Sequence, residues 1–317
     1  MKKILITGCA GFIGSHVSER FLALGWAVIG MDNFDPFYPK EIKEKNLSTV
    51  LDNPMFSFIN GDIRNLSDYP KEGVDLVLHL AAKAGVRPSI EDPEDYFSVN
   101  VTGTQVLHSW MRQFGVKKLL FSSSSSIYGN NKTIPFSETD VVDYPISPYA
   151  ASKKTGELIN HVEHHLYGID VVNLRFFTVY GPRQRPDLAI HKFVDKMFNG
   201  TPIQIYGDGR TKRDYTFIHD ICDGLVAAAD FIEDFTGFEI VNLGNNSPVE
   251  LKYLVDALYS ATGVQHEVEY TKMQPGDVDI TFANTTKAKR LFGYQPKVGI
   301  EEGVLSFVSW YKEINNI

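Results

Sequence analysis

A tyrosine and a lysine stand four residues apart in the segment SPYAASKKTGE, as Tyr149 and Lys153. On a helix this spacing places the phenol and the ammonium on one face, one turn apart. A free tyrosine, with a pKa near ~10, is a poor base at neutral pH, but a nearby cation favours the phenolate and lowers that pKa. The pair could therefore remove a proton from an alcohol while the carbon-bound hydrogen leaves as hydride. Such pairs also arise by chance on helix surfaces, so the surrounding elements decide their meaning.

The N-terminal segment KKILITGCAGFIG offers a site for a hydride acceptor. Gly8, Gly11 and Gly14 form G-x-x-G-x-x-G between an expected strand and a helix expected from Phe12. Glycines at such positions allow a tight turn, close approach of backbone to a pyrophosphate, and close packing of helix on strand. The phosphates would lie at the helix N-terminus, where free N–H groups favour an anion. By itself this pattern fits a plain tight turn equally well.

The end of the next expected strand supports the cofactor interpretation. Asp32 closes the segment WAVIGMD and follows Gly14 by 18 residues, close to the ~20 expected for the acid that binds an adenosine ribose. A carboxylate there accepts from both ribose hydroxyls and repels a 2′-phosphate. The sequence therefore predicts NAD in preference to NADP.

Strand-like and helix-like segments alternate through the first half of the chain, in KILITG, WAVIGMD, FSFINGDI, DLVLHLAA, KKLLFSSS and GIDVVNLRFF. Apolar strands alternating with helices predict an α/β fold, a Rossmann-type doubly wound parallel sheet covered on both faces. Beyond Gly181 the pattern loosens into shorter pieces. We therefore expect an NAD-binding Rossmann domain over 1–178 with a return segment over 214–243. A smaller C-terminal α/β domain that binds the substrate is expected over 179–213 and 244–317.

Further candidates follow the expected strands, where open α/β sheets bind their ligands. Asp62 could cap an adenine, and the small residues of LAAKAG would let backbone lie along the cofactor, although both could be ordinary strand-ending turns. The residues expected to contact NAD are Gly8, Gly11, Phe12, Ile13, Gly14, Asp32, Asn33, Asp62, Ile63, Leu80, Ala81, Ala82, Lys83, Ser122, Tyr149, Lys153 and Phe176.

Composition narrows the class of protein. The net charge of −8 over 317 residues argues against a nucleic-acid partner, which usually meets a basic surplus. Cys9 and Cys222 have no pairing or metal-ligand spacing, so a reducing cytoplasm is expected and no metal is expected. No apolar run approaches the ~20 residues of a membrane span. The N-terminal apolar stretch is short and broken by glycines, which argues against a signal peptide.

The motifs taken together resemble the extended short-chain dehydrogenase/reductase family of nucleotide-sugar epimerases and dehydratases. They are the glycine motif, SSSSSIYG at 122–129, Tyr149-x-x-x-Lys153, and RFFTVYGPRQRPD at 175–187. They occur in order over nearly the whole chain. The resemblance implies an enzyme with tightly held NAD and a C-terminal domain that grips a nucleotide diphosphate.

The resemblance also gives the serine run a chemical meaning. In the family, a Ser or Thr four residues before the tyrosine of this element hydrogen-bonds the reacting sugar oxygen, and here that position is Ser124. Enzymes that eliminate water or lose carbon dioxide carry a Glu where this chain has Ser126, and sugar 4,6-dehydratases carry an Asp where it has Ser125. A neutral serine is a poor proton carrier, so the run favours simple epimerisation. Ser124 and Ser126 join Tyr149 and Lys153 as catalytic candidates, and which serine contacts the reacting oxygen stays open. Ser122 and Ser123 fit strand-end packing or cofactor contacts.

Several segments of the second half resemble the family's parts that hold a UDP-sugar. Arg213 resembles the diphosphate-binding arginine, and TPIQIYGDG, with Gln204 and Tyr206, resembles the segment that holds uracil. Asp277, in QPGDV, resembles a residue that faces the ribose or phosphates. Arg87, in KAGVRPSIEDP, resembles one that closes over the sugar.

The sugar is indicated by a surplus of positive charge in RFFTVYGPRQRPD. This segment, with MQPGDV later, looks most like the UDP-glucuronate 4-epimerase branch, and the UDP-galactose branch has Asn where Thr178 stands. Thr178 and Arg185, with Ser125 and Ser126 nearby, would hold the C5 carboxylate. Arg183 and Gln184 also match some glucose-type epimerases, and the arginines could form a solvated basic loop.

We therefore predict C4 epimerisation of UDP-glucuronate to UDP-galacturonate by transient oxidation, rotation and re-reduction. The alternatives are a UDP-glucose 4-epimerase, a UDP-glucuronate decarboxylase or sugar 4,6-dehydratase, and a non-catalytic NAD-binding regulator. A homodimer is expected through the helix of Tyr149 and the preceding TGTQVLHSWMRQF, whose apolar stripe could equally cover the sheet. That stripe consists of Val106, Leu107, Trp110 and Met111.

Overall fold

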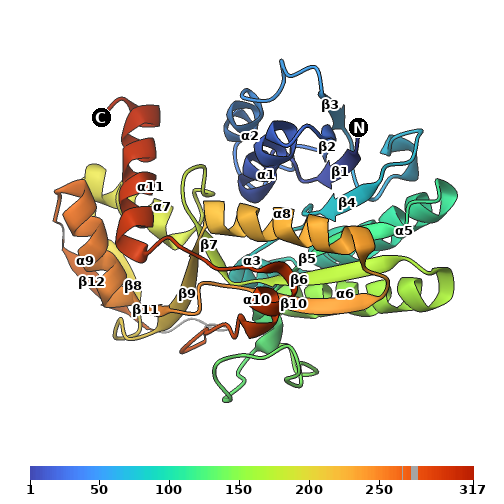
Figure 1. The fold of residues 1–317 in the computed structure, drawn as a ribbon. Helices are drawn as coiled ribbons and strands as arrows, with labels where there is room; N and C mark the ends of the chain where they lie inside the picture. The colour runs from blue at the N-terminus through green and yellow to red at the C-terminus, as the bar shows by residue number, and fades with distance from the viewer. Residues whose placement is uncertain (266, 273–277) are drawn as a thin grey trace.

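A seven-stranded sheet forms the centre of the computed structural model, which describes residues 1–265, 267–272 and 278–317. Its strand order is β10-β6-β5-β4-β1-β2-β3, and every neighbouring pair is parallel (Figure 1). The order reverses direction between β1 and β4, which is where a doubly wound sheet binds its ligands. The predicted Rossmann-type α/β fold is confirmed. The strands are β1 (Lys3–Thr7), β2 (Ala27–Asp32), β3 (Phe56–Asn60), β4 (Leu76–His79), β5 (Lys118–Ser124), β6 (Asp170–Phe176) and β10 (Phe238–Leu243).

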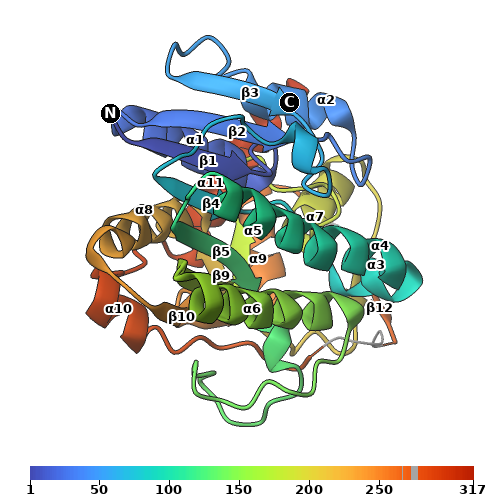
Figure 2. The ribbon, with the colours of Figure 1, turned by 90° about the vertical axis from the view of Figure 1, so that its right-hand side faces the viewer.

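Helices cover both faces of this sheet because side chains alternate along each buried strand. Ile4 and Ile6 of β1 belong to the core under α1, α2 and α8, whereas Leu5 between them belongs to the core under α5. Figure 2 shows α5 and α6 side by side in front of the sheet. No helix among the described residues combines the length and apolar character that a membrane span requires. The helices are α1 (Phe12–Ala23), α2 (Lys40–Leu47), α5 (Gly103–Gln113), α6 (Pro148–Tyr167) and α8 (Ile218–Asp234).

Short helices connect some of these elements near the carboxyl ends of the strands. Three of them lie in sequence between β4 and α5, and another continues directly from β5. They are η1 (Leu66–Asp68), α3 (Val86–Glu91), α4 (Pro93–Phe97), the π-helical turn η2 (Ser98–Thr102) and η3 (Ser125–Tyr128).

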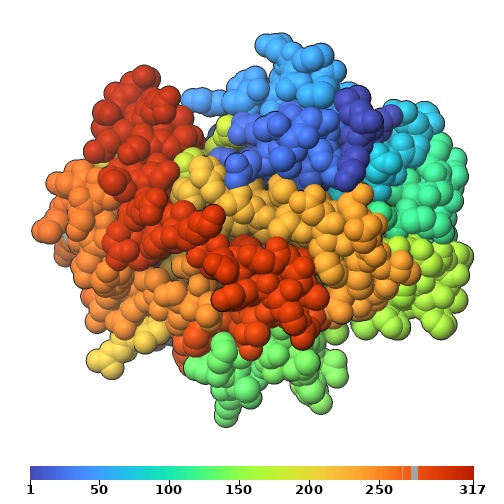
Figure 3. Space-filling view, in the orientation of Figure 1, coloured from blue at the N-terminus to red at the C-terminus, as the bar shows by residue number. Residues whose placement is uncertain are grey.

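The described residues of the second half of the chain add two small sheets and four helices beside the large sheet. β11, β9 and β7 form one small sheet, and β12 pairs with β8 in the other. The large core continues from Val241 of β10 to Phe307 of α11, and Figure 3 shows these orange and red C-terminal segments gathered at the left and centre of the molecule. The elements are β7 (Thr178–Tyr180), α7 (Ala189–Phe198), β8 (Ile203–Tyr206), β9 (Lys212–Phe217), β11 (Pro248–Glu250), α9 (Leu251–Thr262), β12 (Val268–Thr271), α10 (Thr286–Phe292) and α11 (Ile300–Asn315).

The chain returns to the large sheet late in the sequence. β10 pairs with β6 from Phe238 to Leu243, and α8 packs against α1. The expected return segment 214–243 thus contains β10, a strand of the large sheet, and α8, a helix that covers this sheet. The exact domain boundaries stay a prediction.

The apolar stripe of α5 covers the sheet instead of facing outward. Leu107, Trp110 and Met111 are buried in the core under α5, and the Trp110 indole donates to the carbonyl of Pro70 at 2.8 Å. Of the two interpretations of this stripe, packing on the sheet is therefore the one the structure supports. Exposed apolar side chains lie instead on α6, at Leu158, Val162 and Leu166.

Candidate active site

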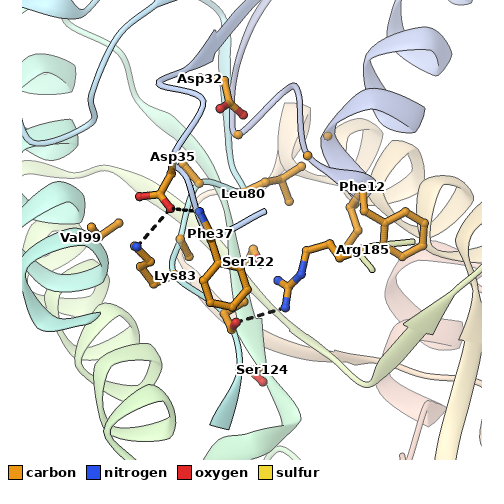
Figure 4. A pocket seen from close by; sticks show the side chains of 18 of the residues that line it. Phe12, Asp32, Asp35, Phe37, Leu80, Lys83, Val99, Ser122, Ser124 and Arg185 are labelled. Carbon is orange, nitrogen blue, oxygen red and sulfur yellow. Dashed lines mark hydrogen bonds and ion pairs between the residues drawn. The ribbon is translucent and has the colours of Figure 1, made fainter. Parts of the chain in front are cut away.

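A cavity of about 360 Å³ lies at the carboxyl ends of the strands in the large sheet (Figure 4). Its lining comes mainly from the segments at the ends of β1, β2, β3, β4, β5 and β6 and from the start of α6. The residues predicted to contact NAD all line it: Gly8, Gly11, Phe12, Ile13, Gly14, Asp32, Asn33, Asp62, Ile63, Leu80, Ala81, Ala82, Lys83, Ser122, Tyr149, Lys153 and Phe176. The structure therefore brings together residues from seven separate segments.

The first turn of the cavity is shaped to receive an anion. Gly8 has a φ of 73°, and a Cβ on Gly14 would overlap the carbonyl oxygen of Gly8, so both positions require glycine. α1 begins directly after Gly11, with no side-chain cap and no acidic residue in its first turn. Its free N–H groups and its dipole therefore favour a phosphate. This turn fits the pyrophosphate of a dinucleotide.

Asp32 lies at the end of β2 beside a lysine that the sequence reasoning missed. Its buried carboxylate accepts from the backbone N–H of Ala10 at 3.1 Å and of Phe34 at 2.9 Å. Lys43 of α2 places its Nζ 3.9 Å from Asp32 Oδ1 and donates to the carbonyl of Asp35 at 2.8 Å. Burial raises the pKa of Asp32, and the charge of Lys43 acts against that rise. The carboxylate can accept from the hydroxyls of a ribose, and the ammonium beside it can donate to them.

A network of ion pairs links the loop after β2 to the loops after β3 and β4. Lys83 Nζ lies 3.1 Å from Asp35 Oδ1 and 2.7 Å from Asp95 Oδ2, and Figure 4 shows the first of these pairs. Asn33 donates to Asp62 at 3.1 Å, and hydrogen bonds from Arg64 lower the pKa of Asp62 to about 2. Lys83 lines the cavity as predicted, with its ammonium held by two carboxylates.

The predicted catalytic pair is positioned by the first turns of α6. Ser147 caps this helix by accepting from the N–H of Ala150 at 3.1 Å, and Pro148 opens it. This start places Tyr149 and Lys153 in the cavity wall, one turn apart. The spacing argument from the sequence therefore holds in three dimensions.

The pKa of Tyr149 depends on its burial and on two neighbouring residues, Ser124 and Arg185. Burial raises the pKa of Tyr149, while a hydrogen bond with Ser124 and the charge of Arg185 lower it. Lys153, on the next turn of α6, is buried and places its ammonium 5.0 Å from the centroid of the Phe121 ring. Arg185 is therefore a cation that the sequence reasoning did not connect with Tyr149, and the effect expected of Lys153 on this pKa stays a prediction.

Lys153 itself is poised to bind a ligand. Burial lowers its pKa to about 7, and the charge of Glu157 acts in the opposite direction. Its ammonium makes no hydrogen bond within the described part of the chain, although a buried ammonium usually has partners. It can therefore donate to the hydroxyls of a ribose that is bound in the cavity. With Asp32 and Lys43 at the other end of the cavity, the protein has polar partners for both riboses of a dinucleotide.

The serine run divides into residues with different contacts. Ser122, Ser123 and Ser124 all line the cavity, and Ser123 also donates to Glu157 Oε1 at 2.7 Å. Ser124 Oγ accepts from the hydroxyl of Ser126 at 2.9 Å and from its N–H at 3.1 Å. Ser125 and Ser126 belong to η3 and are outside the cavity lining. Ser124 is thus the serine that hydrogen-bonds Tyr149, and Ser126 in turn hydrogen-bonds Ser124.

A buried ion pair behind the cavity was not foreseen from the sequence. Glu157 of α6 and Arg175 of β6 are each 1% exposed, and two hydrogen bonds of 2.9 Å join them. Arg175 also donates to the hydroxyl of Tyr128 at 2.9 Å, which donates to Asn242 at 2.7 Å. The pair fixes α6 against β6 one turn beyond Lys153. Its two members lie 18 residues apart, which no local pattern reveals.

The predicted substrate residues fall into two groups. Thr178 and Arg185 line the cavity together with Tyr149. Arg87 of α3 stacks on Tyr206 of β8, with the guanidinium carbon 4.2 Å from the ring centroid. The second group lies outside the cavity lining and consists of Arg87, Gln204, Tyr206 and Arg213. Asp277 lies outside the described residues.

Comparisons with known proteins agree with this site. The model of the NAD dependent epimerase/dehydratase family matches residues 4–244. The chain belongs to this family. Its cofactor is NAD, as the sequence predicted.

Relatives and solved structures of this epimerase family span the whole chain. A UDP-glucuronate 4-epimerase of Thermodesulfobacterium geofontis is 41% identical and covers 98% of this chain and 96% of its own length. A crystal structure of UDP-glucuronic acid 4-epimerase from Bacillus cereus, with UDP-glucuronic acid and NAD, has a TM-score of 0.92 and 36% identity over 98% of this chain and 99% of its own. UDP-glucose 4-epimerase from Thermotoga maritima, solved with UDP-glucose, has a TM-score of 0.90 and 32% identity over 99% of both chains.

Proposed function

We propose that this family member is an NAD-dependent UDP-sugar 4-epimerase that converts UDP-glucuronate to UDP-galacturonate. The observation that supports this most is the position of Arg185, which lines the same cavity as Tyr149 and acts on its pKa. A guanidinium there can hold a carboxylate of the reacting sugar with charge-assisted hydrogen bonds. The names of several relatives point to the same sugar.

In this proposal the chain's own residues handle protons and orient the sugar. NAD, when bound, supplies the hydride acceptor and later the hydride donor at C4. Tyr149 takes the proton of the C4 hydroxyl while Ser124 hydrogen-bonds the same oxygen, and Lys153 binds the cofactor ribose. After the keto-sugar has rotated in the cavity, Tyr149 returns the proton to the C4 oxygen. Ser125 and Ser126 supply no second proton carrier, which disfavours dehydration and decarboxylation.

We assign the remaining predicted residues to the nucleotide part of the substrate. Arg213 would bind the diphosphate, and Gln204 and Tyr206 of β8 would lie along the uracil. Arg87, which stacks on Tyr206, would close over the sugar. Asp277 keeps its predicted role at the ribose or phosphates.

Incubation of the purified protein with UDP-glucuronate, followed by NMR of the products, tests the proposal. UDP-galacturonate as the product supports it. A pentose product would indicate a decarboxylase, and turnover of UDP-glucose alone would indicate the glucose-type epimerase. Absence of turnover with every UDP-sugar would favour a non-catalytic NAD-binding regulator.

A homodimer formed through α6 is proposed as the working form. Leu158, Val162 and Leu166 recur every four residues and are 55%, 50% and 60% exposed, so they form one apolar stripe on the outer face of α6. A second copy of the same stripe would bury it. Sedimentation should give a dimer at micromolar concentration, and Leu158→Asp should shift it toward monomer. A wild-type monomer contradicts the proposal.

A reducing compartment such as the cytoplasm is proposed as the protein's location. Cys9 and Cys222 are both free and buried in the structure, as thiols are in reducing compartments. Fractionation of the source cells would test this location.

A further inference from the structure

The guanidinium of Arg185 is held on three sides by residues that the proposed mechanism does not use. Asp187 accepts from Nε at 2.9 Å and from Nη2 at 2.8 Å, which is a bidentate pair. The carbonyl of Ala84 accepts from the same Nη2 at 3.2 Å. Phe37 places its ring centroid 5.2 Å from the guanidinium carbon, a distance at which the ring attracts a cation. Figure 4 shows the Phe37 ring beside Arg185.

These contacts use the Nε and Nη2 donors of the guanidinium and leave its Nη1 side without a partner among the described residues. An arginine has five N–H donors in a fixed fork, and three of them are engaged by Asp187 and Ala84. The two donors on Nη1 have no hydrogen-bond partner within residues 1–265, 267–272 and 278–317. Arg185 is 17% exposed and lines the cavity. Nη1 is therefore the part of Arg185 that remains for a ligand.

We propose that Asp187 is a positioning residue that fixes Arg185 so that Nη1 receives the carboxylate of the sugar. Phe37 and Ala84 assist by holding the plane of the guanidinium. This inference rests on the proposed UDP-glucuronate substrate and adds the residue that gives its arginine one orientation.

A free arginine side chain would lose rotamer entropy when it binds a carboxylate. Here the Arg185 side chain has already lost this entropy in the folded protein, because Asp187 holds it in place before the substrate binds. Burial lowers the pKa of Arg185, but the hydrogen bonds and charge of Asp187 more than offset this effect, so the guanidinium stays charged.

Fixing the carboxylate also bears on the fate of the oxidised sugar. In a 4-keto uronate the C5–C6 bond breaks when carbon dioxide leaves, its electron pair forms the enolate of the C4 ketone, and a proton returns to C5. This loss is easiest when the carboxylate stands perpendicular to the carbonyl. A rigid Arg185 that keeps another orientation would suppress it.

The opposite role for Asp187 is that of a competitor, a carboxylate that occupies Arg185 until the substrate displaces it. The two roles differ in the sign of one measurement. A positioning residue makes UDP-glucuronate bind less well when it is removed, whereas a competitor makes it bind better.

Asp187→Asn is the test, because Asp187 is 31% exposed and its loss should not unfold the protein. We expect the KM for UDP-glucuronate to rise about tenfold, which corresponds to one charge-assisted hydrogen bond. The dissociation constant of UDP, measured by calorimetry, should stay unchanged, and the fraction of pentose product should rise. Asp187→Glu should restore part of the effect, since it keeps the charge.

Asp223→Asn is the matched control, because Asp223 pairs with Arg20 on the surface, at the contact of α1 and α8. It should leave all three quantities at wild-type values. A lower KM in Asp187→Asn would make Asp187 a competitor and overturn the proposal, as would an unchanged KM and product ratio. If Arg185→Ala also leaves the KM for UDP-glucuronate unchanged, the proposed substrate fails together with this inference. If only Asp187→Asn is neutral, this inference fails alone.

Discussion

Replacement of Glu157 by glutamine should weaken the fold and shift the titration of Lys153 at the same time. Glu157 and Arg175 are each 1% exposed, and the carboxylate accepts two hydrogen bonds from the guanidinium and one from Ser123. Glutamine keeps the shape but leaves the charge of Arg175 buried without a counter-ion. Breaking a buried pair in this way costs about 3–5 kcal/mol of unfolding free energy, which denaturant unfolding would measure.

The same substitution has a second, electrostatic effect on the cavity. The pKa of Lys153 is about 7 in the folded protein, where burial lowers it and Glu157 raises it, against roughly 10.4 in an unfolded chain. Between these two pKa values, Lys153 binds fewer protons in the folded protein than in the unfolded chain. The contribution of Lys153 to the free energy of unfolding therefore rises with pH over this range. Without the charge of Glu157, the pKa of Lys153 in the folded protein should fall below 7, and the pH range over which stability rises should widen. NMR titration of lysines labelled at Cε, with Lys153→Met to assign the signal, would follow this.

A double variant separates the two effects. Glu157→Gln with Arg175→Met removes both buried charges, so most of the lost stability should return, while the pKa of Lys153 stays low. Glu44→Gln is the control, since Glu44 forms an exposed pair with Lys40 worth under about 0.5 kcal/mol. A Glu157→Gln variant as stable as this control, with an unchanged Lys153 titration, would refute the reasoning.

Four further substitutions test the cavity and the predicted diphosphate ligand. Tyr149→Phe should keep NAD binding but reduce turnover by about 10²–10⁴, because the proton acceptor is lost; near-normal activity would show that another base acts. Asp32→Ala should weaken the preference for NAD over NADP, measured by binding of both cofactors, since the ribose acceptor and the repulsion of a 2′-phosphate disappear together; an unchanged ratio would remove Asp32 from the site. Arg185→Ala should weaken turnover of UDP-glucuronate by about ten- to a hundredfold, the loss of one charged hydrogen-bonding partner, and leave UDP binding intact, whereas Arg213→Ala should weaken both ligands. Equal loss of both ligands in Arg185→Ala would make Arg185 a phosphate ligand.

Residues with short-range tasks could be predicted from the sequence. The turn at Gly8 and Gly14 and the acid at Asp32 follow from local geometry, because a strand, a tight turn and a helix fix their positions. Tyr149 and Lys153 follow from the periodicity of one helix. The order of elements in turn predicted that the strand ends would meet at one edge of the sheet.

Contacts between distant segments could not be predicted in this way. Lys43 reaches Asp32 only because α2 folds back over the end of β2, and Glu157 meets Arg175 through the packing of α6 on β6. The stripe of α5 fitted both a sheet and a partner helix, since either surface would bury the same side chains. Asp187 stood in a recognised motif, but its pairing with Arg185 depends on loop conformation. These features require the three-dimensional arrangement.

The fate of the hydrogen at C4 tests the epimerase mechanism most directly. UDP-glucuronate that carries deuterium at C4 would be converted in ordinary water, and the product would be analysed by NMR and mass spectrometry. Transient oxidation with return of the same hydride predicts UDP-galacturonate that retains its deuterium at C4. A product that has exchanged this deuterium for a solvent proton would contradict the account, because Tyr149 and the cofactor cavity would then not be carrying out a hydride transfer.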